Sequence, residues 1–327
     1  MEAFGEPELC FPQLLNASCV KPKRSPFEAV LTYILVSSIS LLTAFLNLLV
    51  IVSISHFKQL HTSTNLLLLS LAVSDFLLAP LLPFQIMLLN GCWFLGDLMC
   101  TLYHYVVYII TLASVGTMVL LSVDCYVAVC YPLHYSAKIT RRRVKICVCL
   151  CWICSVIFQS LILMKNLQQP GRYNSCIGEC VIVINFIAGL ADVTFSFIIP
   201  ITAIIVLYMR VFVVAVSQAR AMRSHIAAVS QRSTKVTAKN SEWKAARTLG
   251  VVVFAFLMCF CPYYCVSLTG KDNMNASSAA FIIILSYSNA CLNPMIYALF
   301  YPWLRKSVKL ILTFKILQPD SCEANLL

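Results

Sequence analysis

Seven long apolar segments, separated by short polar ones, dominate this chain. A helix needs about 20 predominantly apolar residues to cross the hydrocarbon core of a lipid bilayer. The segments cover residues 28–54, 64–90, 98–128, 144–165, 183–215, 246–268 and 278–301. The pattern therefore predicts an all-α membrane protein, built as one bundle of seven transmembrane helices.

The composition agrees with a membrane bundle rather than a soluble domain. Of the 327 residues, 60% are hydrophobic and only 11% are charged. We divide the chain into a tail at residues 1–27, a helical domain at residues 28–301, and an amphipathic helix with a second tail at residues 302–327. Because the first residues lack a basic head followed by an apolar run, we expect no cleaved signal peptide.

Basic side chains indicate how the bundle is oriented in the membrane. They gather at residues 138–145, 220–247 and 305–315, three segments that share one end of the bundle. Since cytoplasmic loops carry the excess of Lys and Arg, that end is predicted to be cytoplasmic and the N-terminus extracellular. Asn16 and Asn275, which begin Asn-x-Ser glycosylation motifs, both fall on the predicted outer side. The net charge of +11 therefore follows from membrane topology, and we expect no nucleic-acid partner.

Each predicted span also carries a polar, aromatic or proline residue that packing alone would not require. A proline inside a helix removes a backbone hydrogen bond and bends the helix, so a chain keeps one where a helix must bend or move. The markers, in chain order, are Asn47, Asp75, Asp124, Cys125, Tyr126, Trp152, Pro200, Tyr208, Phe256, Phe260, Pro262, Asn293, Pro294 and Tyr297. Together they resemble the rhodopsin-like G-protein-coupled receptors over essentially the whole chain. The resemblance implies a rhodopsin-like fold at the plasma membrane, with a short amphipathic eighth helix.

A closer resemblance is to the trace amine-associated receptors. It is carried by residues 293–303, by residues 53–62 after the first span, and by the loop cysteines Cys176 and Cys180. The family usually has glycine, tryptophan, serine and phenylalanine at four positions where this chain has Leu46, Phe260, Ala290 and Leu304.

The same resemblance implies how the outer cysteines pair. In that family one loop cysteine bonds to the third span and the other bonds to the N-terminal tail. This implies one disulfide between Cys100 and Cys180 and another between Cys19 and Cys176. The remaining outer cysteines, whose pairing stays open, are Cys10 and Cys92.

Acidic residues inside membrane spans are costly and are therefore candidates for function. Asp75 resembles the sodium-binding aspartate of the receptor family, and hard oxygen ligands suit such an ion. The alternative is a buried polar network without an ion, which the missing hydroxyl at Ala290 favours. We expect no other cofactor. By the same resemblance, the neighbours of Asp75 at this site would be Ser114, Asn289 and Asn293.

Asp192 is the candidate anchor for a ligand. In many trace amine-associated receptors the ligand's ammonium pairs with an aspartate on the third span, at the position that Val107 occupies here. The carboxylate lies instead on the fifth span, which resembles a branch of the family expanded in fishes. Ser196 follows Asp192 by four residues and would share its helix face. By analogy the ligand would also contact Tyr108, Thr111, Phe260, Tyr263, Tyr264 and Tyr287.

These residues suit an ammonium ion. Aromatic faces attract a cation by about 0.5–2 kcal/mol each, and the carboxylate would add a charge-assisted hydrogen bond. One carboxylate favours a monoamine over a diamine, because a second cation would need Asp272 or Glu179 at the rim. The alternatives are that Asp192 pairs with a neighbouring hydroxyl or water and binds no ligand, and that the tyrosines only pack.

The third span ends in Asp124-Cys125-Tyr126, where the receptor family has Asp-Arg-Tyr. The family's arginine pairs at rest with an acid on the sixth span, the position of Glu242 here, and contacts the G protein in the active state. A cysteine thiol carries no charge and forms only weak hydrogen bonds. We expect higher basal activity from the lost restraint and weaker coupling from the lost contact, with the second effect dominant. The remaining switch residues are Tyr208, Pro262, Asn293, Pro294 and Tyr297.

Competing functions need features that the sequence lacks. A transporter would show an internal repeat with broken half-helices, and the seven spans show neither. A retinal-binding opsin needs a lysine in the seventh span, and residues 278–301 contain none. No catalytic triad or phosphate loop suggests an enzyme. We therefore expect an olfactory-type receptor for small amines that raises cyclic AMP through a stimulatory or olfactory G protein. The alternative is an amine-binding membrane protein with weak or lost coupling.

Overall fold

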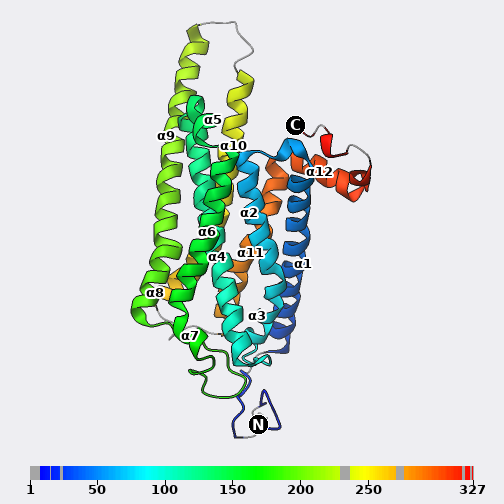
Figure 1. The fold of residues 1–327 in the computed structure, drawn as a ribbon, viewed down its shortest axis with the longest axis vertical. Helices are drawn as coiled ribbons and strands as arrows, with labels where there is room; N and C mark the ends of the chain where they lie inside the picture. Colours follow the sequence, from blue (N-terminus) through cyan, green and yellow to red (C-terminus); the bar gives the residue numbers. More distant parts are fainter. Residues whose placement is uncertain are drawn as a thin grey trace.

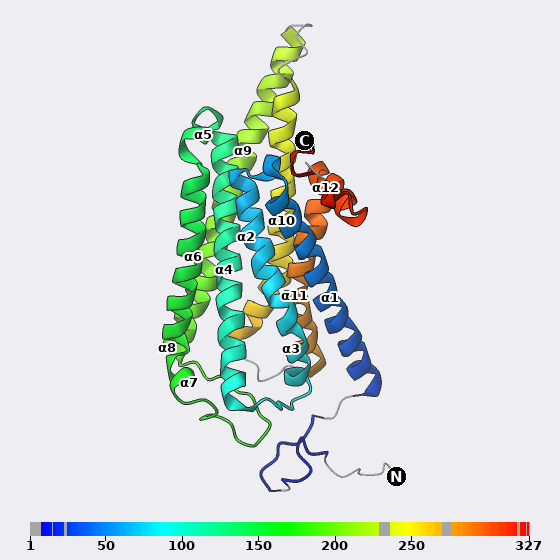
Figure 2. The same ribbon diagram turned by 45° about the vertical axis from the view of Figure 1, so that its right-hand side comes forward.

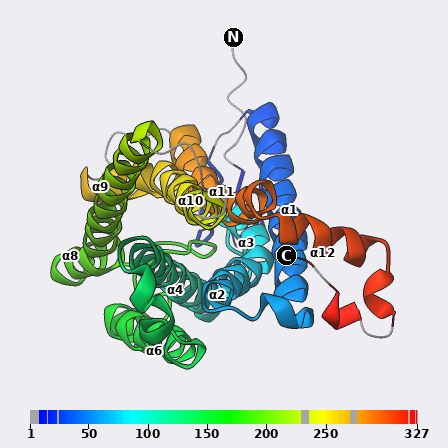
Figure 3. The ribbon, with the colours of Figure 1, turned by 90° about the horizontal axis from the view of Figure 1, so that it is seen from above.

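The computed structural model describes residues 8–14, 16–22, 25–228, 236–269, 276–318, 321–324 and 326. Within these ranges, only the backbone is described at residues 215, 218–228, 236–249, 267, 269 and 276. Long helices run side by side along one axis (Figure 1) and stand in a ring when seen from above (Figure 3). Figure 2 shows the N-terminal segment at one end of the ring and the C-terminal segment at the other.

The predicted bundle of seven helices, followed by a short amphipathic helix, is confirmed. Six of the seven helices are long and apolar enough to cross a membrane, judged on the described side chains. The remaining helix is α10 (Val236–Thr269), in which the described apolar segment is the shorter Gly250–Val266. The spans are α1 (Pro26–His56), α2 with α3 (Ser63–Leu78 and Leu82–Leu89), α4 (Gly96–Cys130), α6 (Arg141–Ile162), α8 with α9 (Phe186–Val193 and Ile199–Ala228), α10 (Val236–Thr269) and α11 (Ala276–Phe300).

Short helical turns connect or follow these spans. They matter for the site where they interrupt a span or hold a loop against it. They are η1 (Lys58–Leu60), η2 (Ala79–Leu81), η3 (Pro132–His134), α5 (Tyr135–Lys138), α7 (Met164–Gln168), the π-helical turn η4 (Thr194–Ile198), α12 (Pro302–Leu312), η5 (Lys315–Leu317) and η6 (Ser321–Glu323).

Two of the predicted spans contain a short turn with a different hydrogen-bond spacing within one helical segment. The second span passes through η2, which contains Pro80, before α3 begins. The fifth passes through η4, the wide π turn that lies just before Pro200. A proline has no N–H to donate to the preceding turn, so the backbone there adopts a different hydrogen-bond spacing.

Side-chain caps explain where several helices begin. Thr140 accepts a hydrogen bond from the Arg143 amide (3.4 Å), so α6 begins before the predicted residue 144. Asn185 accepts one from the Ala188 amide (2.7 Å), so α8 begins at Phe186 rather than at residue 183. A cap satisfies a backbone N–H that has no partner inside the helix, which favours a start at that residue.

The outer face of α6 shows why the bundle suits lipid. Its exposed apolar side chains recur at the spacing of one helical face, so they form a stripe that points away from the other helices. A stripe of this kind would be unfavourable in water and is stable against hydrocarbon. Its members are Ile146, Leu150, Ile153, Ile157 and Leu161.

Buried polar groups join the helices on the inside of the ring. Asn47 on α1 is fully buried and donates to the carbonyl of Ala290 on α11 (2.9 Å). In the last turn of α1, the Ser53 hydroxyl accepts from Ser307 on α12 (2.9 Å). Since neither bond can be replaced by water in the membrane, each fixes one helix against another.

Three disulfides hold the N-terminal segment and the loop before α8 against one end of the bundle. Cys100 on α4 bonds to Cys180, and Cys19 bonds to Cys176, the two pairs that the resemblance implies. The third bond joins the two cysteines whose pairing the sequence leaves open, Cys10 and Cys92.

Gly178 allows the close packing around these disulfides. Its φ of +101° is a conformation that other residues rarely adopt, and an added Cβ would lie 3.2 Å from the Cβ of Cys10. Cys10, Cys19 and Cys92 are buried together, with Phe11 packed against them. The N-terminal segment is therefore part of the folded outer surface.

We predict that Cys92→Ser will release the Cys10 thiol and lower the stability of the bundle. The lost bond spans 82 residues, and removal of a native disulfide typically costs about 2–4 kcal/mol. Thiol labelling and the melting temperature (Tm) of the purified receptor will measure both effects. Cys322→Ser, at a cysteine outside the disulfides, is the control. An unlabelled Cys10 in Cys92→Ser would contradict the pairing.

Candidate functional site

A cavity of about 590 Å³ lies between the helices near the end that carries the disulfides. Side chains of α3, α4, α6, α8, α10 and α11 line it, together with the loop that follows Cys180. All nine residues that the sequence analysis assigns to ligand contact lie on its wall. They are Val107, Tyr108, Thr111, Asp192, Ser196, Phe260, Tyr263, Tyr264 and Tyr287.

Asp192 is the one acidic residue among those that line the cavity. It lies in the last turn of α8, and its side chain is partly exposed. Its Oδ1 accepts a hydrogen bond from Nε2 of Gln159 on α6 (3.0 Å). The carboxylate is thus oriented by a neutral neighbour, and no cation lies against it among the residues described.

Gln159 is a site residue that the sequence analysis misses. Its side chain is only 2% exposed, and its Oε1 has no hydrogen-bond partner among the described residues. A carboxylate can only accept hydrogen bonds, so the amide nitrogen must face Asp192 and the amide oxygen must point elsewhere. A buried acceptor without a partner costs about 1–3 kcal/mol. An amide inside the apolar segment 144–165 is the signal that would have identified it.

Ser196 lines the cavity, but its hydroxyl is engaged with protein groups. It donates to the backbone carbonyl of Asp192 (2.5 Å) and accepts from the hydroxyl of Tyr264 (3.3 Å). Ser196 lies in the π turn η4, and it lines the same cavity as Asp192 four residues earlier. Ser196 therefore links α8 to α10 beside the carboxylate.

Aromatic rings cover the wall of the cavity on α10. Tyr264 stacks on Phe197 with ring centroids 4.1 Å apart, and its other neighbour Tyr263 meets it edge to face at 5.4 Å. Phe260, one turn earlier, lies 4.8 Å from Phe256. These rings present both apolar surface and negative ring faces, the combination that attracts an organic cation.

A second group of polar residues lies on the side of the cavity formed by α3 and α11. Gln85 accepts hydrogen bonds from the hydroxyls of Tyr103 (2.8 Å) and Tyr287 (3.3 Å). The sequence analysis misses Gln85 because it carries no charge and lies in an apolar segment. It joins the second, third and seventh spans at the cavity wall.

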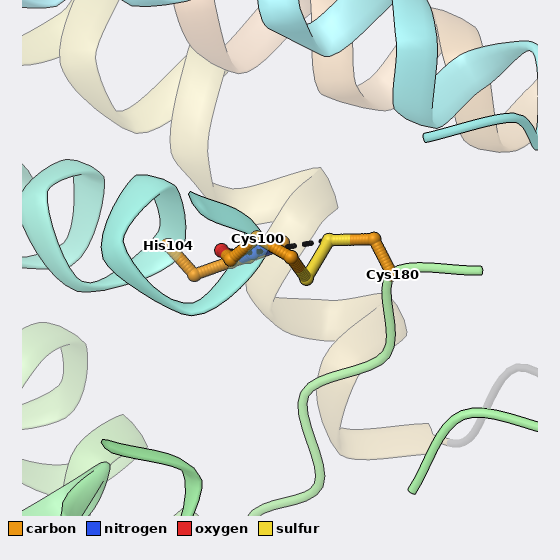
Figure 4. Close-up of side chains that lie close together, drawn as sticks. All are labelled: Cys100, His104 and Cys180. Carbon is orange, nitrogen blue, oxygen red and sulfur yellow. Dashed lines mark hydrogen bonds between the residues drawn. A yellow bond between two sulfur atoms is a disulfide. The ribbon is translucent and has the colours of Figure 1, made fainter. Parts of the chain in front are cut away.

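Cys100, His104 and Cys180 lie together at the edge of the cavity (Figure 4). Their nitrogen and sulfur atoms are within 4.8 Å of one another, which is close enough to share a metal ion. The two sulfur atoms, however, form the disulfide drawn in Figure 4. Since thiolates are the sulfur ligands of metals, this group does not fit a metal while the disulfide is intact.

The residues assigned to sodium binding are brought together between α2, α4 and α11. Asn293 donates to Asp75 (3.0 Å) and to Asn289 (3.0 Å), and its own Oδ1 is buried without a partner among the described residues. A small cavity of about 20 Å³ adjoins Asp75, Ser114 and Asn289. This volume suits one water molecule or one small ion. Carboxylate and amide oxygens are fitting ligands for sodium.

The group around Asp124 ties α4 to α2 and α5. Asp124 is buried and accepts hydrogen bonds from Thr64 (2.7 Å) and from Tyr135 (2.9 Å). Burial raises the pKa of Tyr135 to about 12, so this hydroxyl stays protonated and donates at neutral pH. Cys125 next to it is buried in the main apolar core, 4% exposed. The carboxylate is therefore paired with neutral donors.

The other switch residues lie on α4, α9, α10 and α11. Pro262 and Pro294 lie inside α10 and α11, and Tyr126 packs edge to face on Tyr131. Tyr208 is half-buried on α9, and Tyr297 is buried with no partner for its hydroxyl among the residues described. The backbone of Glu242 lies in α10, but its side chain is outside the described part.

Of the two glycosylation candidates, only Asn16 lies in the described part of the chain. Asn16 is exposed in the N-terminal segment, three residues before Cys19, which bonds to Cys176. Asn275 lies outside the described residues, as does Asp272, the rim acid considered for a second cation. The other rim acid, Glu179, accepts a hydrogen bond from the Ser175 amide (2.5 Å).

We predict that Tyr135→Phe will destabilise the receptor by about 1.5–3 kcal/mol, because it deletes one hydrogen bond to a buried carboxylate. Thermal unfolding of the purified protein will measure this change. Thr64→Val and the double variant complete a mutant cycle, in which a coupling energy is expected because both hydroxyls bond to Asp124. Strictly additive effects would contradict a shared network.

One group of known proteins is similar to this chain along nearly its whole length. The family model described as 7 transmembrane receptor (rhodopsin family) matches residues 46–297. Trace amine-associated receptor 13c of Danio rerio is 34% identical, over 99% of this chain and 98% of its own. Trace amine-associated receptor 8a of Rattus norvegicus is 36% identical, over 98% and 96%. Trace amine-associated receptor 6 of Pan troglodytes is 36% identical, over 98% and 95%.

Proposed function

Because this chain belongs to the trace amine-associated receptors of the rhodopsin family, we propose that it is an olfactory-type receptor for small amines, with the ligand's ammonium anchored by Asp192. The chain is a multi-pass plasma-membrane receptor and not an enzyme. Family membership makes a heterotrimeric G protein its partner. The observation that carries the proposal is a single carboxylate on the wall of a cavity of about 590 Å³.

The charge balance at the cavity supports one ammonium group per ligand. Asp192 supplies one negative charge, and Gln159 holds its Oδ1 without neutralising it. A partly buried carboxylate without a cationic neighbour favours a bound cation beside it. Val107, at the position where many relatives carry the anchor, adds only apolar surface. A monoamine fits this arrangement better than a diamine.

The aromatic wall supports an organic cation rather than an inorganic one. Tyr263, Tyr264 and Phe260 face the same cavity as Asp192. Their rings would cover the alkyl or aryl part of the amine and attract its charge. Tyr108, Thr111 and Tyr287 complete the contact surface from α4 and α11.

For signalling, we infer an extracellular N-terminus and coupling to a stimulatory or olfactory G protein that raises cyclic AMP. Ligand binding would move α10 about Pro262 and rearrange the group around Asn293, Pro294 and Tyr297. The disulfide-rich end faces the oxidising exterior in this orientation. The basic segments then face the cytoplasm.

A second candidate function is an amine-binding membrane protein with weak or lost coupling. It is favoured by Cys125, which is buried in the apolar core where the family has a charged arginine. In place of an arginine neighbour, Asp124 accepts hydrogen bonds from Thr64 and Tyr135. The substitution would remove both the resting-state restraint and the contact with the G protein, and the loss of the second contact would dominate.

Two groups of this receptor would bind further partners. Asp75, Ser114, Asn289 and Asn293 would hold an allosteric sodium ion, which would stabilise the resting arrangement of α2, α4 and α11. The apolar outer faces of the helices would contact membrane lipid. Neither partner changes the assignment of Asp192.

The amine assignment is tested by cyclic AMP output across a panel of small amines. Asp192→Ala is expected to reduce potency by about 100-fold or more, because it removes the charged partner of the ammonium. Asp97→Ala, at an exposed acid beyond the cavity, is the matched control and should respond like the native chain. Equal potency in Asp192→Ala and the native chain would contradict the anchor.

Coupling is tested in the same assay by Cys125→Arg. We expect a larger evoked response than in the native chain, because the arginine restores the contact with the G protein. A response found only in Cys125→Arg would favour the second candidate function. An unchanged response, at equal surface expression, would show that Cys125 does not limit coupling.

Sodium binding is tested by the Tm of the purified receptor in NaCl and in KCl. At a sodium concentration ten times its Kd, binding would stabilise the native chain by about 1.4 kcal/mol. Asp75→Asn should remove the difference between the two salts, and Asp97→Asn should retain it. A native chain that melts identically in both salts would argue for a polar network without an ion.

A further inference from the structure

The cavity has a neutral amide on the side away from the Asp192 carboxylate. Oε1 of Gln85 on α3 accepts hydrogen bonds from the hydroxyls of Tyr103 on α4 (2.8 Å) and Tyr287 on α11 (3.3 Å). All three of these side chains line the cavity, as Asp192 does. Figure 3 shows α3 and α8, which carries Asp192, on opposite sides of the ring. One side of the cavity is therefore anionic and the other is neutral and polar.

The amide nitrogen of Gln85 is accessible from the cavity. Both tyrosine hydroxyls donate to Oε1, and Nε2 has no hydrogen-bond partner among the residues described. None of the fully buried atoms that lack a partner in the described part of the chain belongs to Gln85, so Nε2 retains accessible surface. Because Gln85 lines the cavity and is only 7% exposed in total, that surface faces the cavity.

The chemistry of this side decides which ligand group it can bind. An amide nitrogen only donates hydrogen bonds, so it cannot accept one from a second ammonium. No Lys or Arg is among the described residues that line the cavity, so a carboxylate on the ligand would have no cationic partner there. An uncharged oxygen accepts an N–H group without needing an opposite charge. Gln85 Nε2 therefore suits an ether or a hydroxyl oxygen.

We propose that Gln85 Nε2 donates a hydrogen bond to an uncharged oxygen of the ligand, so that the cavity prefers monoamines with a distal ether or hydroxyl over plain alkylamines. This inference rests on the proposed function, because Asp192 must hold the ammonium at the other side. A cavity of about 590 Å³ lies within the range of sites that hold drug-sized ligands. It therefore has room for a ligand chain that reaches both groups.

The inference separates two roles that Gln85 could have. As a donor to the ligand, it would matter only for amines that carry an oxygen at the right distance from the ammonium. As a residue that merely joins α3 to α4 and α11, it would affect amines with and without that oxygen alike. Pairs of amines in which an ether oxygen replaces one methylene distinguish these roles, because their shape is nearly the same.

The experiment measures the ligand-induced rise in Tm of the purified full-length receptor, a readout that does not depend on coupling. The probes are linear methoxyalkylamines with three to eight methylenes between nitrogen and oxygen, each paired with the alkylamine that has a methylene in place of the oxygen. At one or two chain lengths the ether should act on the native chain at a concentration about 5-fold lower, the effect of one neutral hydrogen bond. In Gln85→Met, a variant of similar volume without the amide, this advantage should disappear.

Gln159→Met is the matched control, because it removes the other amide that lines the cavity, the one bonded to Asp192. It should change the ether and the alkylamine of a pair alike and so preserve the preference for the ether. No advantage of the ether at any chain length in the native chain would overturn the inference. An advantage that persists in Gln85→Met would overturn it too, because the oxygen would then bind elsewhere.

Should Gln85→Met fail to fold, Gln85→Glu takes its place. This variant keeps the shape of the side chain and an oxygen for both tyrosine hydroxyls, but it has no N–H to donate. Loss of the ether advantage in Gln85→Glu would support the inference, and its retention would overturn it.

The fate of the proposed function is read separately from Asp192→Asn. If plain alkylamines raise the Tm of the native chain but not that of Asp192→Asn, the anchor stands whatever the outcome at Gln85. If no amine in the panel raises the Tm of the native chain, the proposed function fails and the inference at Gln85 fails with it.

Discussion

Hydrocarbon offers no hydrogen bonds, so each backbone amide within the membrane must find its partner inside its own helix. The rest of this structure depends on that constraint. Where a proline or a π turn breaks the regular backbone hydrogen bonding, the helix deviates from a regular α-helix. Pro80 interrupts the second span, and the π turn before Pro200 interrupts the fifth. Pro262 and Pro294 lie inside α10 and α11. These breaks surround the cavity and the group of residues at Asp75.

The same constraint governs the side chains. Asn47 bonds to a carbonyl of α11, Asp75 to Asn293, and Asp192 to Gln159, so each buried polar group reaches across to another helix. Such bonds set how the helices are arranged, since apolar packing against lipid alone is indifferent to it. Among the described residues, unpaired buried atoms remain beside both Asp192 and Asp75, where we propose a ligand and an ion.

The seven spans could be predicted because bilayer thickness dictates their length, and the cavity residues because the family resemblance supplied their positions. The starts of α6 and α8 each differ by three residues from the predicted ones, since Thr140 and Asn185 act as caps that hydrophobicity does not reveal. Gln159 was not predicted as a site residue, because the sequence does not show which way an uncharged amide in an apolar segment points or which residue it contacts. The bond from Cys10 to Cys92 depends on the path of the tail, which no pattern in the sequence specifies.

The three disulfides also impose an order on biosynthesis. Cys19 bonds to a partner 157 residues further on, so at a synthesis rate of about 5–20 residues per second it waits roughly 8–30 s for that partner to be made. During this interval Cys10 and Cys19 are close neighbours in sequence, and a bond between them is the easiest error. A bond between Cys10 and Cys19 would have to be undone by thiol–disulfide exchange before Cys10–Cys92 and Cys19–Cys176 could form. The yield of mature protein should thus depend on the isomerase capacity of the secretory pathway as well as on the stability of the bundle.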